Sequence, residues 1–76
     1  IESFKIYPNP VNSGVFEIII ENNQDASFNL YNILGEKIIS NNSILQPIKI
    51  GDLQSGIYLI EVYKNNQSIV KKLIVN

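Results

Sequence analysis

Apolar and polar residues alternate along most of this sequence with a period of two, which is the pattern of half-buried strands. No segment repeats apolar residues at spacings of three and four over two turns, so we predict no helix. Seven short segments carry the alternation, and we predict a strand in each of them: 4–7, 14–21, 26–31, 37–40, 48–50, 58–63 and 69–75. Their spacing of about ten residues is typical of an antiparallel β-sandwich.

The gaps between these segments contain residues that form turns. Pro8-Asn9-Pro10 lacks two amide donors and therefore cannot lie inside a central strand. Gly35 and Gly56 each precede a predicted strand, where a positive φ is often required. Asparagine and serine side chains bond to nearby backbone and favour turns, and they occupy three gaps: 12–14, 22–25 and 65–66.

The positions that share a face under this period predict the core. We expect these side chains to be buried: Phe16, Ile18, Ile20, Phe28, Leu30, Ile38, Ile48, Ile50, Leu53, Tyr58, Ile60 and Val62.

The last strand has two possible registers. A two-residue turn at 65–66 pairs Val62 with Ile69 on the core face, but it also directs Lys71 inward, opposite Ile60. Either the Lys71 ammonium extends past an edge into solvent, or a bulge shifts the tail so that Ile74 faces the core. The sequence leaves both alternatives open.

Composition restricts the chemistry that this chain can perform. The chain has 76 residues, which indicates one domain over 1–76 with a small core. It contains no Cys and no His, so thiol nucleophiles, disulfides, most zinc sites and the usual general base are missing. Six lysines against seven acids give a net charge of −1, which argues against binding nucleic acid. With tyrosine left aside, the longest apolar runs are three residues, far short of the roughly 20 that a membrane-spanning helix needs.

The remaining candidates for chemistry are weak. Glu17 and Glu21 lie on the polar face of one strand, where a solvated face is the simpler interpretation than an acid/base pair. Calcium requires six to eight oxygen ligands, and the Asn22, Asn23 and Asp25 group supplies too few. Catalytic residues, metals and cofactors are therefore not expected. Tyr31 and Tyr63 point outward under the period of two, and we interpret each as the cross-strand partner of a residue on a neighbouring strand.

The order of the turn residues resembles a known family over essentially the whole chain. Four segments carry the likeness: Tyr-Pro-Asn-Pro at 7–10, a Leu-Gly turn inside 28–38, Leu-Gln-Ser-Gly-Ile-Tyr at 53–58 and Lys-Lys-Leu-Ile-Val at 71–75. Together they resemble the type A C-terminal sorting domain of the type IX (Por) secretion system of Bacteroidetes. That family has an immunoglobulin-like sandwich of seven strands, in agreement with the strand prediction made from the pattern.

The resemblance implies a targeting function. Such a domain directs a cargo protein, first exported by a signal peptide, from the periplasm through an outer-membrane secretion translocon. A sortase-like peptidase then usually removes it, and the cargo is secreted or attached to the cell surface. The translocon and the sortase-like peptidase are therefore the implied partners, and we expect the domain to be a monomer. Because residue 1 is Ile, we also expect the chain to be a fragment of a longer secreted protein.

The resemblance also transfers motif positions to this chain. Pro8 and Pro10, with Asn9 between them, match the family's opening prolines, which end the first strand and protect a sheet edge. Gly35 matches the turn glycine, and Gly56 and Tyr58 match a Gly-x-Tyr pair. The family has a terminal strand of basic residues followed by apolar residues, which is linked to recognition. In this chain it corresponds to Lys71, Lys72, Leu73, Ile74 and Val75. The family commonly ends in a basic residue shortly afterwards, whereas this sequence ends at Asn76.

The alternative to a sorting domain is a carbohydrate-binding or adhesive sandwich module attached to a secreted enzyme. Such a module would present a planar aromatic platform or a bound calcium, whereas a sorting domain would present an accessible terminal strand. The sequence does not identify the cargo.

Overall fold

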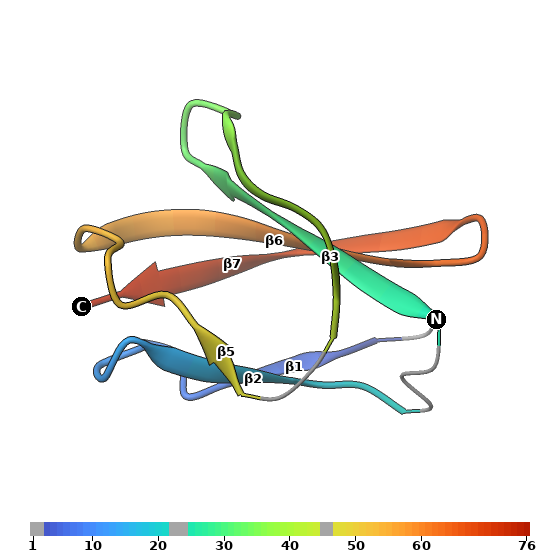
Figure 1. Ribbon diagram of the computed structural model, residues 1–76, viewed down its shortest axis with the longest axis horizontal. Helices are drawn as coiled ribbons and strands as arrows, with labels where there is room; N and C mark the ends of the chain where they lie inside the picture. Colours follow the sequence, from blue (N-terminus) through green and yellow to red (C-terminus); the bar gives the residue numbers. More distant parts are fainter. Residues whose placement is uncertain (1–2, 22–24, 45–46) are drawn as a thin grey trace.

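The computed structural model describes residues 3–21, 25–44 and 47–76, and it shows two antiparallel sheets packed face to face (Figure 1). One sheet has the order β1 (Lys5–Tyr7), β2 (Val15–Ile19) and β5 (Ile48–Lys49). The other has the order β4 (Lys37–Ser43), β3 (Ala26–Asn32), β6 (Gly56–Lys64) and β7 (Gln67–Val75). The predicted antiparallel sandwich of seven strands is confirmed.

The strand order is immunoglobulin-like. Strands β1, β2 and β5 oppose β3, β6 and β7 just as strands A, B and E oppose C, F and G in immunoglobulin domains. Strand β4 pairs with β3, the place that C′ takes in variable domains. The connection between β4 and β5 therefore leads the chain from the larger sheet back to the smaller one.

The hairpin of β6 and β7 decides between the two registers left open by the sequence. Asn65 has a φ of 57°, which the tight two-residue turn requires, and pairing continues without a shift from Lys64 opposite Gln67 to Gly56 opposite Val75. Lys71 lies opposite Ile60, as the first register predicts. The alternative with a bulge is wrong, because Leu73 and Val75 are buried whereas Ile74 between them is only half-buried.

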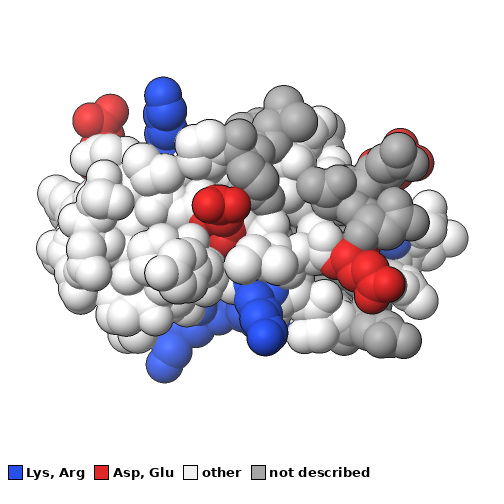
Figure 2. All heavy atoms as spheres, turned by 90° about the horizontal axis from the view of Figure 1, so that it is seen from below, with Lys and Arg blue, Asp and Glu red and all other residues white. Residues whose placement is uncertain are grey.

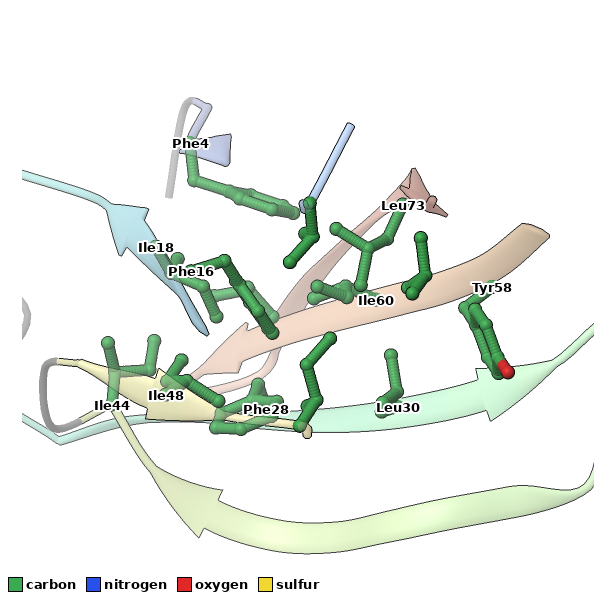
Figure 3. Close-up of a cluster of buried hydrophobic side chains, with 14 of the residues drawn as sticks. Phe4, Phe16, Ile18, Phe28, Leu30, Ile44, Ile48, Tyr58, Ile60 and Leu73 are labelled. Carbon is green, nitrogen blue, oxygen red and sulfur yellow. The ribbon is translucent and has the colours of Figure 1, made fainter. Parts of the chain in front are cut away.

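The core lies between the sheets and is built around three phenylalanines, Phe4, Phe16 and Phe28 (Figure 3). Nine of the twelve predicted core residues are buried: Phe16, Ile18, Phe28, Leu30, Ile48, Ile50, Tyr58, Ile60 and Val62. Ile20 and Leu53 lie at the periphery, where they are partly buried against the core. The list of predicted core residues omits six of the described residues that are buried: Phe4, Val11, Ala26, Ile44, Leu73 and Val75. Of these, Leu73 lies on the core face in the register that the turn at 65–66 predicts.

The prediction for Ile38 is wrong, because its side chain is 41% exposed. Between β3 and β4 the register shifts twice, so that Leu30 pairs with Ile39 while Tyr31 pairs with Lys37. Each shift inserts one extra residue in β4, and the shift between Lys37 and Ile39 breaks the strict alternation, so Ile39 packs against the core in place of Ile38. A period-two pattern cannot reveal such a bulge. Strand β4 also runs three residues beyond its predicted end, to Ser43.

Candidate functional site

The motif segments that lie apart in the sequence meet at one end of the sandwich. Gly56, the first residue of β6, pairs with Val75, the last residue of β7. Asn32, the last residue of β3, pairs with Tyr58, so the turn that holds Gly35 begins at the same end. Residues 8–12, which we call the proline segment, lie against the end of β7. We call this end of the molecule the motif end.

Asn9 connects the proline segment to the terminal strand through its side-chain amide. Its Oδ1 accepts a hydrogen bond from the Ile74 amide at 3.0 Å, and its Nδ2 donates one to the Lys72 carbonyl at 3.1 Å. An asparagine placed beside the open edge of a strand can thus satisfy one donor and one acceptor that would otherwise face solvent. Asn9 therefore covers the edge of β7 at 72–74 as a further strand would.

Val11 continues this contact with its backbone. The Val11 amide donates to the Ile74 carbonyl at 2.7 Å, the Asn76 amide donates to the Val11 carbonyl at 2.9 Å, and Val11 forms a parallel bridge with Val75. The Asn76 side chain also donates to Asn12 Oδ1 at 2.7 Å. After β1 ends at Tyr7, the proline segment thus leads the chain from the smaller sheet to the edge of the larger one. Both Tyr7-Pro8 and Asn9-Pro10 are cis peptide bonds.

The turn between β3 and β4 is fixed by Asn32. Its Oδ1 accepts hydrogen bonds from the amides of Leu34 and Glu36, both at 2.9 Å, and its own amide donates to the Glu36 carbonyl at 2.9 Å. Its Nδ2 donates to Glu36 Oε1 at 2.7 Å. Gly35 has a φ of 88°, which explains why glycine occupies this position. The sequence predicted this requirement correctly.

Tyr58 closes the loop that precedes β6. Its ring is buried, and its hydroxyl donates to the Gln54 carbonyl at 2.7 Å. A tyrosine at the start of strand F that bonds to the backbone a few residues upstream is the tyrosine corner of immunoglobulin-like folds. The Gly56-x-Tyr58 motif therefore has a structural role at the motif end.

The two motif lysines lie in the middle of β7, and their side chains point to opposite faces of the sheet. Lys71 is half-buried on the inner face, where its Nζ lies 5.3 Å from the centre of the Phe4 ring. This is a cation–π contact between the ammonium group and the ring of a core residue. Lys72 is exposed on the outer face, opposite Leu59.

The acidic candidates do not form a site. Glu17, Glu21 and Asp25 are exposed, and Asn22 and Asn23 lie outside the described residues. Within the described ranges, no three acidic side chains come together in a group that could hold a metal ion. Figure 2 shows lysines and acids dispersed over the face that it displays, with uncharged surface between them.

Tyr31 lies on the outer face of β3 as predicted, and it takes part in a polar network. Its hydroxyl donates to Glu61 Oε1 at 2.7 Å, and Asn29 Nδ2 donates to the same oxygen at 3.0 Å. The bonds from Asn29 and Tyr31 lower the pKa of Glu61, because both stabilise the ionised carboxylate. The bond to that carboxylate raises the pKa of Tyr31. Tyr31 pairs with Leu59 of β6. Tyr63 lies on the same strand four residues beyond Leu59, which is about 13 Å along the strand.

Sequence reasoning missed Phe4 and Val11 as parts of the site. Phe4 lies under the Lys71 ammonium, and Val11 forms the bridge to Val75; both are buried. A signal for Phe4 was present, since a phenylalanine two residues before Ile6 continues that strand's inward-facing positions. No signal marked Val11, because an isolated valine between a proline and a turn has no periodic neighbours.

No helix long and apolar enough to cross a membrane occurs in the part of the chain that the structure describes.

Comparison with known proteins identifies the family. The model of the secretion system C-terminal sorting domain matches residues 5–76. The chain is 35% identical over 75 residues to an endo-acting ulvan lyase of Formosa agariphila, a match that covers 93% of this chain and 14% of that enzyme. It is 32% identical over 80 residues to an ulvan lyase of Nonlabens ulvanivorans, a match that covers all of this chain and 15% of that enzyme. The chain thus spans about a seventh of the length of these relatives.

The family match covers nearly every described residue, from the start of β1 to the end of β7. It includes the proline segment, the Gly35 turn, Gly56, Tyr58 and the terminal strand. The sorting function of this family implies interaction with the type IX secretion machinery and export to the cell surface or the extracellular space. The chain belongs to the secretion system C-terminal sorting domain family, and it is a type IX sorting signal.

Proposed function

We propose that the motif end presents the terminal strand to an outer-membrane translocon, and that a sortase-like peptidase then removes the domain from its cargo. The observation that carries this proposal is the attachment of β7 to the proline segment through Asn9 and Val11. This contact and the pairing with β6 together hold residues 72–75 in one extended conformation. Because Asn9 and Val11 occupy the edge of β7, a partner would bind the strand by its outer face, where Lys72 is exposed. Such a partner does not have to order the strand first, which lowers the entropic cost of recognition.

The motif residues have two kinds of role in this proposal. Asn9, Gly35, Gly56 and Tyr58 shape the motif end, with Pro8 and Pro10 setting the path of the proline segment. Lys72, exposed on the outer face of β7, is available to contact the partner directly. Lys71 acts from the inner edge, where its ammonium lies over Phe4.

The relatives suggest the kind of protein to which the domain is attached. Both are lyases that act on ulvan, and the match covers only a small share of each. We propose that the cargo of this domain is likewise an exported enzyme, and that the domain itself, a single unit over 1–76, is monomeric. A carbohydrate-binding module is less well supported, because Tyr31 bonds to Glu61 and lies far along the sheet from Tyr63.

The test is export of a reporter protein that carries a signal peptide at its N-terminus and residues 1–76 at its C-terminus. We expect the reporter in the medium or on the surface of a type IX-competent cell, and in the periplasm of a strain that lacks the translocon. The matched control is the same reporter without the domain, which should remain in the periplasm of both strains. Retention of the complete fusion in a cell that secretes its own cargo would contradict the proposal.

A further inference from the structure

The proline segment covers the edge of β7 over only part of its length. It bonds to the backbone of Lys72 and Ile74, whose amides and carbonyls point away from β6. Backbone groups alternate in direction along an antiparallel strand, so those of Ser68 and Val70 point away from β6 as well. The cover ends at Lys72, and the edge beyond it, toward the turn at 65–66, is open.

The open groups belong to Ser68, Val70 and the amide of Lys72. Among the described residues, none bonds to the backbone of Ser68 or Val70 on the side away from β6. Ser68 is exposed, and Val70 is 53% exposed. Residues 68–72 therefore present amides and carbonyls to solvent at a repeat of about 7 Å, over a length of about 17 Å.

The other edges of the two sheets are protected. The edge strands of the smaller sheet, β1 and β5, have three and two residues. At the opposite edge of the larger sheet, β4 has two register shifts. Short strands and bulges both discourage pairing with a further strand. Residues 68–72 have neither form of protection, because they belong to nine consecutive pairs without a shift.

The geometry of this open segment specifies what can occupy it. A straight row of alternating amides and carbonyls is matched by the backbone of another extended chain, as in β-strand addition. Five residues are an ordinary strand length, so one short extended segment would fill the row and end beside Asn9. The row is also continuous with residues 72–75, the part of β7 that the proposed partner contacts.

We infer that the edge of β7 at 68–72 is a site of β-strand addition, where an extended segment of a partner protein pairs with the backbone of Ser68, Val70 and Lys72. The residue of that segment opposite Val70 is apolar, since it lies beside an exposed β-branched side chain. The inference rests on the proposed function, in which the partner is a component of the outer-membrane secretion machinery. It adds a backbone contact to the proposed contact with the Lys72 side chain.

The experiment compares export of variants of the reporter fusion with export of the unchanged domain. Val70→Pro removes an amide that points away from β6, so the ladder with β6 is kept, and it places the proline ring where the added strand would lie. Val70→Thr is the matched control, because threonine keeps both the amide and the β-branched shape. We expect the initial export rate to fall roughly tenfold for Val70→Pro and to change less than about twofold for Val70→Thr.

Thermal unfolding of each purified domain shows whether the variant is folded. Ser68→Pro removes the next amide that points away from β6, close to the turn, and it gives the same test if Val70→Pro does not fold. We expect the export rate of folded Ser68→Pro to fall as well.

Each contrary outcome has its own meaning. If a folded proline variant is exported as fast as the unchanged domain, the site of strand addition is wrong while the proposed function stands. If Val70→Thr is slowed as much as Val70→Pro, the side chain makes the contact and the inference is wrong. Retention of the unchanged domain in a competent cell would refute the proposed function and this inference with it. Sedimentation that shows a dimer of the unchanged domain, lost in Val70→Pro, would identify a second copy as the occupant and overturn the inference.

Discussion

The two hairpins of the larger sheet are built in opposite ways. The β6–β7 hairpin has a two-residue turn and nine consecutive pairs without a shift, and its far end is tied to the proline segment. The β3–β4 hairpin has a longer turn, two register shifts and an apolar tip that faces solvent. Strand β3 pairs regularly with β6, so the irregularity belongs to β4. The regular hairpin presents a fixed strand, and the irregular one directs side chains away from the core.

The largest effect should come from the core beneath both hairpins. Phe28 on β3 is 1% exposed, and Phe28→Ala should lower the free energy of unfolding by about 3–5 kcal/mol, because it leaves a cavity. That is a large share of the stability of a small domain. Leu34→Ala, at the exposed tip of the same hairpin, is the matched control and should stay within about 0.5 kcal/mol in urea unfolding. Equal losses would mean that the tip is packed in solution.

The turn of the irregular hairpin should be sensitive to its glycine. Gly35→Ala should cost about 1–2 kcal/mol, because an alanine is strained at a φ of 88°. A Cβ at this position would meet no atom within 4 Å, so the cost is conformational and not steric. Gly51→Ala also meets nothing within 4 Å and has no such φ, so unfolding of this control should change less. A loss at Gly51 as large as that at Gly35 would disprove the explanation.

The regular hairpin should loosen at its tied end when Asn9 is changed. Asn9→Ala removes the hydrogen bonds to Ile74 and Lys72, and each such bond contributes about 0.5–1.5 kcal/mol. Both bonds are exposed, so we expect a total near 1 kcal/mol and faster hydrogen exchange at the Ile74 amide. Hydrogen exchange of the Ile60 amide, in the middle of β6, should become faster only by the factor that corresponds to the loss of global stability. If the Ile74 amide stays as protected as before, the proline segment does not hold the terminal strand.

The smallest effect concerns pH and the outer face that the hairpins share. The pKa of the Glu61 carboxyl is lower in the folded domain than its ordinary value of 4.5. Ionised Glu61 therefore stabilises the fold at pH values above 4.5, and this stabilisation is lost as the pH falls through the lower pKa of the folded domain. Glu61→Gln should therefore weaken the loss of stability on acidification from pH 5 downward, measured by urea unfolding at several pH values. Glu17→Gln, on the other sheet, is the control. If the free energy of unfolding falls with pH equally in Glu61→Gln and in the unchanged domain, the claim that ionised Glu61 stabilises the fold is contradicted.

The contrast between the hairpins also separates what the sequence could predict from what it could not. For the β6–β7 hairpin, the alternation and the Asn65-Asn66 turn narrowed the register to two alternatives, and the structure has the one without a bulge, with Lys71 inward. Ile38 was placed wrongly because a bulge changes the face of a residue without changing the residue itself. Motif order identified the family, but no local pattern could show that Asn9 bonds to residues more than sixty positions away. Such a contact exists only after the two sheets have packed.

The most direct test of the central claim, that the terminal strand is a recognition element of a sorting domain, is export of the reporter carrying Lys71→Met together with Lys72→Ala. Methionine keeps an apolar stem against Phe4 and removes only the ammonium, and Lys72 is exposed, so the domain should remain folded. We predict that purified variant and unchanged domain unfold within a few degrees of each other, while the variant reporter is retained in the periplasm. Full export of this variant, and of a domain that lacks residues 71–76, would contradict the claim.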